Sequence, residues 1–146
     1  MRDTFSDFIK NFDELRGRHV TKMSDIPVSV VLSKADLHKK DIGLVKINAR
    51  YKQNPYEFVT KEGQDGFALT RDALCREFLA RSGFYNVCNM LDGEFKNVRY
   101  FPVSAMGHPP DGRPYEPWGV MEPIMWILDH IRGDFKDTIY NMEMAH

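Results

Sequence analysis

The sequence lacks the features that mark membrane, secreted and nucleic-acid-binding proteins. No apolar run approaches the ~18 residues that a membrane span needs, and the first residues lack the apolar core of a signal peptide. Basic and acidic residues nearly balance, with 20 lysines and arginines against 21 aspartates and glutamates. Because no long basic run occurs either, we expect neither a nucleic-acid partner nor a membrane partner.

Cysteine is scarce as well, and histidine follows no metal-binding pattern. The two cysteines, Cys75 and Cys88, lie in helical patterns, which is more typical of buried thiols than of a metal or redox pair. The 5 histidines are scattered, without a His-x-x-x-His pair. We therefore expect no metal site and a reducing, cytoplasmic setting.

The chain does have the composition of one globular domain. Its 146 residues are 42% hydrophobic and 28% charged, which is enough for a single core. Helical and strand patterns alternate along the chain, which indicates an α/β fold whose parallel strands are joined by crossovers. We predict a helix in 1–18, a strand and turn over 27–37, helices within 48–97, a strand and loop over 98–107, a helix over 119–132 and a tail over 133–146.

Several of these elements carry more specific expectations. The β-branched run after Pro27 predicts a strand buried on both faces. Pro102 cannot donate to a ladder, so the second strand should lie at a sheet edge or end its pairing there. Thr70 is the expected N-cap of a helix over 71–82. The helix over 119–132 is apolar nearly all round and should be deeply buried.

Polar residues that suit a purine base follow the first strand directly. The strand breaks into Ser33-Lys34-Ala35-Asp36 at its carboxyl end, where ligands bind in open α/β sheets. The carboxylate of Asp36 can accept two parallel N–H bonds, which guanine offers and adenine does not. The methylene stem of Lys34 can lie along the ring while its ammonium group stays hydrated.

A second strand end reads Phe101-Pro102-Val103-Ser104-Ala105-Met106. Together the two strand ends resemble the base-reading elements of P-loop (TRAFAC-class) GTPases, an Asn/Thr-Lys-x-Asp element and a Ser-Ala-x element. The resemblance implies that Asp36 reads the guanine ring, that Lys34 stacks on it, and that Ser104 and Ala105 close its far side. The base-binding set it implies is Ser33, Lys34, Asp36, Ser104, Ala105 and Met106.

The resemblance extends over roughly residues 1 to 132 and is nearest to bacterial double-GTPase-type proteins. It rests further on the Tyr-Phe-Pro-Val-Ser-Ala-Met-Gly strand and the Gly-Val-Met-Glu-Pro-Ile-Met-Trp-Ile-Leu helix. It implies part of a three-layer P-loop GTPase-like sheet with helices on both sides. The spacing from Asp36 to Ser104 exceeds that of minimal members of the class, so 48–97 should hold an insertion.

The sequence departs from the family where phosphates would bind. No Gly-x-x-x-x-Gly-Lys-Ser/Thr and no Asp-x-x-Gly occurs, and at Gly107 to Gly112 the following pair is Arg-Pro. The chain therefore resembles the C-terminal half of such a domain, so GTP with magnesium is expected only in an intact domain. We expect weak binding of a guanine nucleotide and no hydrolysis by this chain alone, and no residue is assigned as catalytic. The expected partners are the missing N-terminal half and, through exposed sheet surface, a second copy.

Two other interpretations remain open. Lys34 and Asp36 could cap a solvated loop in another α/β fold, or the chain could be a degenerate G-like domain that binds proteins without nucleotide. The prolines at 114 and 117 have the spacing of a polyproline ligand. For the segment around them we favour a stiff connector wrapped over the domain.

Overall fold

The computed structural model describes residues 7–11, 23–61 and 63–132. Most of the predicted helix in 1–18 lies outside these residues, although 7–11 is helical, with Ile9 buried in the core. The predicted tail over 133–146 lies outside them entirely. Within the described residues, no helix has the length and apolar character needed to cross a membrane.

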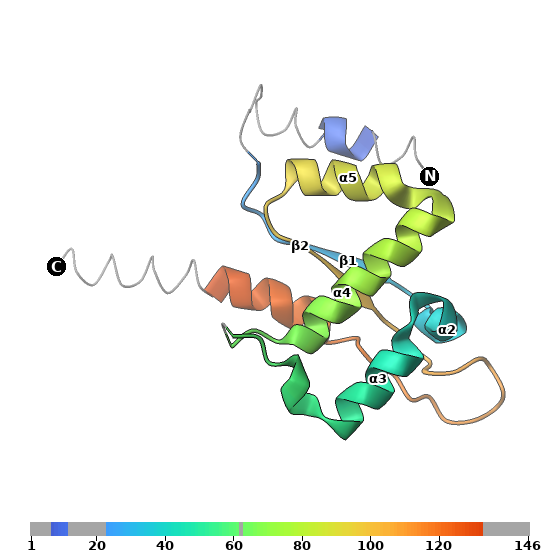
Figure 1. Ribbon diagram of the computed structural model, residues 1–146. Coiled ribbons are helices and arrows are strands. Elements are labelled where there is room, and N and C mark those ends of the chain that lie inside the picture. The colour runs from blue at the N-terminus through green and yellow to red at the C-terminus, as the bar shows by residue number, and fades with distance from the viewer. Residues whose placement is uncertain (1–6, 12–22, 62, 133–146) are drawn as a thin grey trace.

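Two parallel strands from distant parts of the chain form the centre of the fold (Figure 1). They are β1 (Val28–Leu32) and β2 (Val98–Pro102). Their register runs from Val28 opposite Val98 to Leu32 opposite Pro102. Both strands are rich in β-branched and aromatic residues, which favour extended backbone. The predicted α/β class, with parallel strands joined by a crossover, is confirmed.

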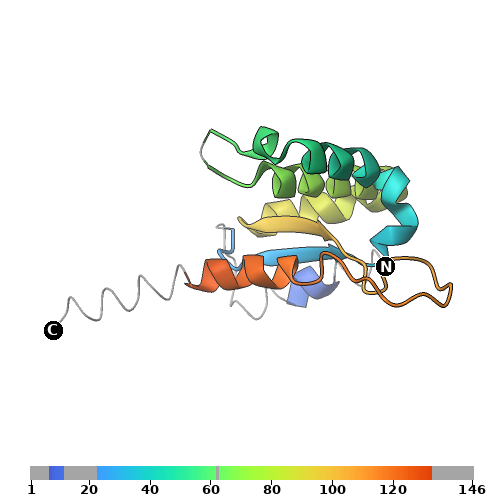
Figure 2. The same cartoon turned by 90° about the horizontal axis from the view of Figure 1, so that it is seen from below.

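The crossover between the strands is almost wholly helical. In chain order it contains η1 (Ala35–His38), α2 (Lys39–Ile42), α3 (Leu44–Gln53), η2 (Pro55–Phe58), α4 (Gly66–Leu79), η3 (Ala80–Phe84) and α5 (Tyr85–Glu94). A further helix covers 122–132. Figure 2 shows α3, α4 and α5 on one side of the strands and the helix over 122–132 on the other.

The start of α4 differs from the prediction. Asp65, not Thr70, is the N-cap, and its Oδ1 accepts the N–H groups of Phe67 at 3.0 Å and Ala68 at 3.2 Å. Thr70 lies inside the helix, where its hydroxyl donates to the Gly66 carbonyl at 2.7 Å. Both residue types can cap a helix, and only the backbone path decides which of them precedes the first turn.

The core lies between the strands and the pair α4 and α5. Tyr100 of β2 is 1% exposed, and Leu91 of α5 packs in the same buried cluster. Cys75 and Cys88 are free thiols buried in this cluster, as the sequence predicts. The two helices meet at Gly83, whose φ of 94° makes the chain turn between them.

Side chains of α4 close the outer edge of β2. The N–H of Tyr100 donates to Asp72 Oδ1 at 2.7 Å, and the Val98 carbonyl accepts from Arg76 Nη2 at 2.8 Å. The carbonyl of Asn97, just before Val98, instead accepts the Val28 N–H of β1. The backbone groups of alternate residues in β2 therefore point toward β1 and away from it. Pro102 belongs to the outward set, where a missing N–H costs no ladder bond. Because the sheet in the described residues has two strands, β2 and its Pro102 lie at an edge there.

Two burial predictions are wrong. β1 is not buried on both faces, because Val31 is 47% exposed. The helix over 122–132 is not deeply buried, because Ile124 and Ile131 are 50% and 51% exposed. This helix contacts one face of the sheet through Trp126, which lies edge-on to Phe101, while Leu128 is a further exposed apolar residue, at 39%. Apolar composition all round a helix does not by itself determine which sides are covered.

Candidate functional site

The loops that follow the two strands are tied together at one end of the sheet. Val103 N–H donates to the Leu32 carbonyl at 2.9 Å, which extends the parallel ladder beyond β2. Ala35 N–H then donates to the Val103 carbonyl at 3.0 Å, and Ala35 is 1% exposed. The two loops therefore meet at the carboxyl end of the sheet, where open α/β folds bind ligands.

A serine and an aspartate that are 68 residues apart in sequence make the central contact. Ser104 Oγ donates to Asp36 Oδ1 at 2.6 Å, and the same oxygen accepts the N–H of Gly107 at 2.8 Å. Ser104 is 1% exposed, so these bonds are shielded from water. In the described part of the chain, Asp36 Oδ2 has no protein donor. The carboxylate is thus held in one orientation with acceptor capacity to spare.

Lys34 precedes this aspartate in an unusual backbone conformation. Its φ of 56° and ψ of 33° are left-handed, and among the described residues it is the one non-glycine with a positive φ. Such a conformation costs on the order of 1–3 kcal/mol and persists where the surroundings impose it. Here the buried Ala35 and its bond to Val103 fix the chain directly after Lys34.

A cavity of about 590 Å³ opens between the two loops. Its walls include all six residues that the sequence assigns to base binding: Ser33, Lys34, Asp36, Ser104, Ala105 and Met106. The structure therefore brings the whole predicted set to one place.

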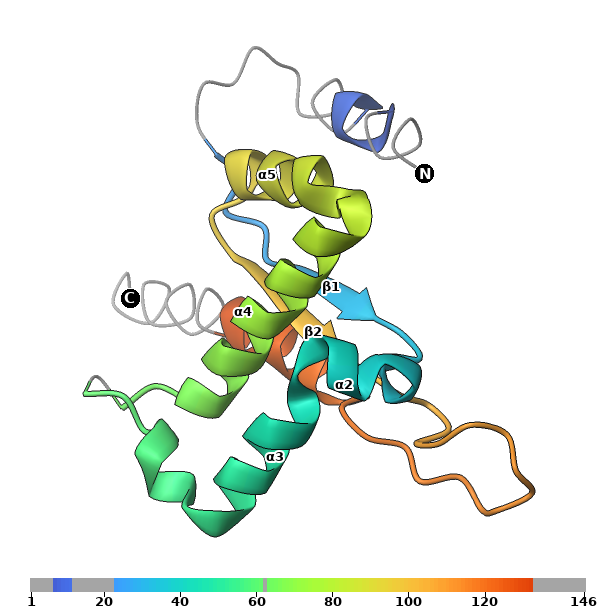
Figure 3. The ribbon, with the colours of Figure 1, turned by 45° about the vertical axis from the view of Figure 1, so that its right-hand side comes forward.

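Sequence reasoning missed part of the lining. Leu37, Val103, His108, Pro109 and Pro110 also face the cavity and make most of its wall apolar. Their closeness in sequence to the predicted site residues could have indicated them, since each lies within four positions of one. The prediction treated the proline-rich segment as a connector wrapped over the domain. It instead projects from the body of the molecule as a loop (Figure 3) and supplies one wall.

The base of this loop is closed by backbone pairing. Ser104 and Trp118 exchange two backbone bonds of 3.1 and 2.9 Å, and Glu116 N–H donates to the Met106 carbonyl at 2.9 Å. The pairing requires glycine at 107. Its φ is +85°, and a Cβ there would lie 2.0 Å from the Glu116 carbonyl oxygen. The two arms of the loop therefore stay in contact next to the cavity.

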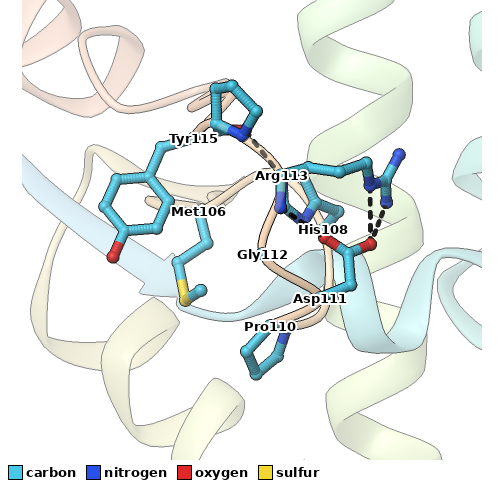
Figure 4. Close-up of a pocket in the computed structure, with 8 residues that line it drawn as sticks. Met106, His108, Pro110, Asp111, Gly112, Arg113 and Tyr115 are labelled. Carbon is cyan, nitrogen blue, oxygen red and sulfur yellow. Dashed lines mark hydrogen bonds and ion pairs between the residues drawn. The ribbon is translucent and has the colours of Figure 1, made fainter.

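His108, Asp111 and Arg113 are the ionisable side chains that lie together on this loop (Figure 4). Hydrogen bonds to the carbonyls of Pro114 and Pro109 raise the pKa of His108, and the nearby Asp111 adds to this effect. The backbone N–H and guanidinium of Arg113 lower the pKa of Asp111. Among the described residues, no group of three or more metal-ligating side chains gathers at one place.

Comparisons of the chain with protein-family models, with curated proteins and with solved structures find no match.

Proposed function

We propose that the cavity binds the base of a guanine nucleotide, as the base-reading half of a P-loop GTPase-like domain. The observation that carries the proposal is the contact between Ser104 and Asp36, which joins two strand ends 68 residues apart around one cavity. A buried serine uses one lone pair of Asp36 Oδ1, so that the second lone pair of Oδ1 and both lone pairs of Oδ2 can accept from a ligand. A planar base also suits walls that are mostly apolar.

In the proposed recognition, three groups of the protein each contact a different part of the base. The Asp36 carboxylate accepts the two adjacent N–H groups of guanine, and the backbone N–H of Ala105 meets the ring carbonyl. Lys34 covers one ring face with its methylene stem. Adenine offers no matching pair of donors to Asp36, so it would leave a half-buried carboxylate unpaired.

Phosphate binding would depend on elements that the sequence does not contain. No Gly-x-x-x-x-Gly-Lys-Ser/Thr occurs, so the charge-assisted contacts that hold a triphosphate are missing. One charged acceptor, one backbone donor and stacking leave at best about −4 kcal/mol, a Kd near 1 mM or weaker. We therefore propose no turnover by this chain alone, and GTP with magnesium as the ligand of an intact domain.

Base specificity tests the proposal directly. The 146-residue chain is titrated with GMP, AMP and XMP while amide NMR signals of the two loops are followed. GMP should shift the signals of Asp36 and Ala105 with a Kd near 1 mM, and AMP should bind at least about tenfold more weakly. GMP, GDP and GTP should bind almost equally and without magnesium dependence. Equal shifts with GMP and AMP would refute base reading by Asp36.

A substitution that changes one oxygen of Asp36 to nitrogen makes this test more specific. Asp36→Asn replaces one acceptor by an amide N–H₂ that faces guanine's donors, at a cost of about 2–4 kcal/mol. Xanthine carries a carbonyl where guanine has its amine, so XMP should bind this variant as well as or better than GMP does. Asp129→Asn, on the exposed side of the helix over 122–132, is the matched control and should change neither affinity. Parallel losses for GMP and XMP in Asp36→Asn would contradict the assigned role.

One observation favours a second candidate, a G-like domain that binds proteins without nucleotide. The helix over 122–132 exposes apolar side chains, among them Ile124 and Ile131, and Met121 just before it is 61% exposed. Contiguous apolar surface of this kind marks interaction sites or faces between copies. This candidate predicts two results. The molecular mass should rise with protein concentration, because this face associates with a second copy. The NMR titration with GMP should show no specific shifts, because no nucleotide binds.

A further inference from the structure

His108 stands between two cavities on the loop that follows β2. It lines the cavity between the two strand-end loops, called the base cavity below, and also an open pocket of about 330 Å³ lined by residues of its own loop (Figure 4). Its side chain is 8% exposed, although its neighbours Pro109 and Pro110 are exposed. A buried histidine on an otherwise exposed loop calls for a partner at each ring nitrogen.

Both ring nitrogens face acceptors. Nδ1 lies 2.8 Å from the Pro109 carbonyl oxygen, and Nε2 lies 2.8 Å from the Pro114 carbonyl oxygen. A carbonyl oxygen only accepts, so both nitrogens must carry a proton to bond both partners. Neutral imidazole carries one such proton and imidazolium carries two. The geometry therefore fits the charged ring.

The charged groups around the His108 ring together favour its protonated, imidazolium form. Asp111 Oδ1 lies 3.3 Å from Nδ1 on the same loop. Arg113 pairs with the other oxygen of Asp111, with Nε and Nη2 each at 2.6 Å, and opposes the imidazolium charge in part. Across the base cavity, Lys34 and Asp36 from the β1–η1 turn carry opposite charges.

We infer that His108, in its protonated form, is a positioning residue for the base cavity. Its two hydrogen bonds join the start of the loop to Pro114, six positions further on, and so hold Pro109 and Pro110 in place as the cavity wall. The inference rests on the proposed function, because it assigns His108 to the site where the base would bind.

The pH dependence follows from the direction of the pKa shift. The pKa of His108 is raised above its ordinary value near 6.5. The closed loop is therefore fully stabilised below about pH 6.5 and loses that stabilisation as the pH rises through the raised pKa. Deprotonation removes one of the two bonds, and a bond of this strength corresponds to about a two- to tenfold change in affinity for the base.

The first measurement needs no nucleotide. NMR signals of the His108 ring are followed between about pH 5 and about pH 9, together with the amides of Gly107 and Gly112. The ring should lose its proton above its ordinary pKa, and the two glycine amides should move with the same midpoint. Asp111→Asn keeps the ring but removes the neighbouring carboxylate, so it should lower this midpoint. A ring that titrates at or below its ordinary pKa would overturn the inference.

The second measurement follows the affinity for GMP over the same pH range. The wild-type affinity should fall about two- to tenfold as His108 loses its proton. His108→Phe keeps the ring shape without donors, so it should bind GMP weakly at every pH with no step. His130→Phe, on the helix over 122–132, is the matched control and should keep the wild-type pH profile, because the His130 ring contacts Trp126 outside the cavity.

The outcomes separate the two proposals. GMP binding with no pH step in the wild type would overturn the role of His108 and leave the proposed function standing. No GMP binding at any pH would overturn the proposed function, and with it this inference. If thermal unfolding shows that His108→Phe is not folded, the pH step in the wild-type affinity for GMP and its shift to lower pH in Asp111→Asn decide instead.

Discussion

At the scale of single residues, the left-handed backbone of Lys34 is the most informative feature of the site. A lysine gains nothing locally from this conformation, and glycine or asparagine would adopt it at lower cost. The backbone that follows imposes this strain, because the buried Ala35 bonds to Val103 directly after Lys34. The Lys34 side chain lines the cavity two residues before Asp36.

Two glycines of the loop allow a matched test of how tightly it is built. Gly107 and Gly112 both have positive φ, but a Cβ at 112 would meet nothing within 4 Å, whereas one at 107 would collide with the Glu116 backbone. Gly112→Ala should cost about 1 kcal/mol in the free energy of unfolding. Gly107→Ala should cost more than about 3 kcal/mol or move the loop. Urea unfolding gives both values, and equal costs would contradict the described closure of the loop.

The site residues differ in how far the sequence could reveal them. The position of Ser33, Lys34 and Asp36 at the sheet end was predictable, because polar residues directly follow an apolar strand, whereas Ser104, Ala105 and Met106 were assigned to the same place through the resemblance to P-loop GTPases. The burial of His108 was not predictable, because it depends on the return of the chain at Pro114. Hydrogen bonds across a loop depend on turn geometry, for which the sequence between 108 and 114 gives no periodic signal.

At the scale of elements, one arginine joins α4, α5 and β2. Arg76 donates to Asp72 at 3.0 Å, to both oxygens of Asp92 at 2.8 and 2.7 Å, and to the Val98 carbonyl. Its guanidinium also lies 4.4 Å from the centre of the Tyr100 ring. These contacts close the edge of β2 and orient α5 against it.

Removal of this arginine should therefore destabilise the whole packing unit. Arg76→Met removes the donor of the Asp92 carboxylate and of the Val98 carbonyl and leaves Asp72 with the Tyr100 N–H alone. Because Arg76 and Asp92 are partly exposed, we expect a loss of about 1–3 kcal/mol in the free energy of unfolding. Arg50→Met is the matched control. Its exposed pair with Glu57 should contribute little. Chemical unfolding measures both variants, and similar small losses would show that the network adds no net stability.

The sequence predicted the elements better than their burial. Both strands and the break at Gly83 follow from local patterns, since β-branched runs and glycine act within a few residues. The exposure of Val31 and Ile124 does not, because an apolar side chain is buried only where another element arrives to cover it. The start of α4 shows a similar limit, since Asp65 and Thr70 are equally good caps by residue type.

At the scale of the whole molecule, the rate at which the buried thiols react measures how often the protein unfolds. Burial, with a smaller effect of the Asp72 charge, raises the pKa of Cys75 to about 12, and Cys88 is also buried. The thiolate is the reactive form, so native protein should react with a thiol reagent only as fast as it unfolds. Denatured chain should react at once. Rapid labelling of native protein would show local opening between α4 and α5.

The connection between the strands has a kinetic consequence for the site. Residues 33–97 connect the two strands, so the chain must close a long loop before Val98 to Pro102 can pair with β1. The cavity forms only after this closure. Contacts of such sequence separation slow folding, because chain entropy is lost before the pairing compensates for it. During synthesis, Asp36 emerges long before Ser104, and the carboxylate stays unoriented until the second strand arrives. In a nascent chain the cavity would therefore form only after β2 has been made.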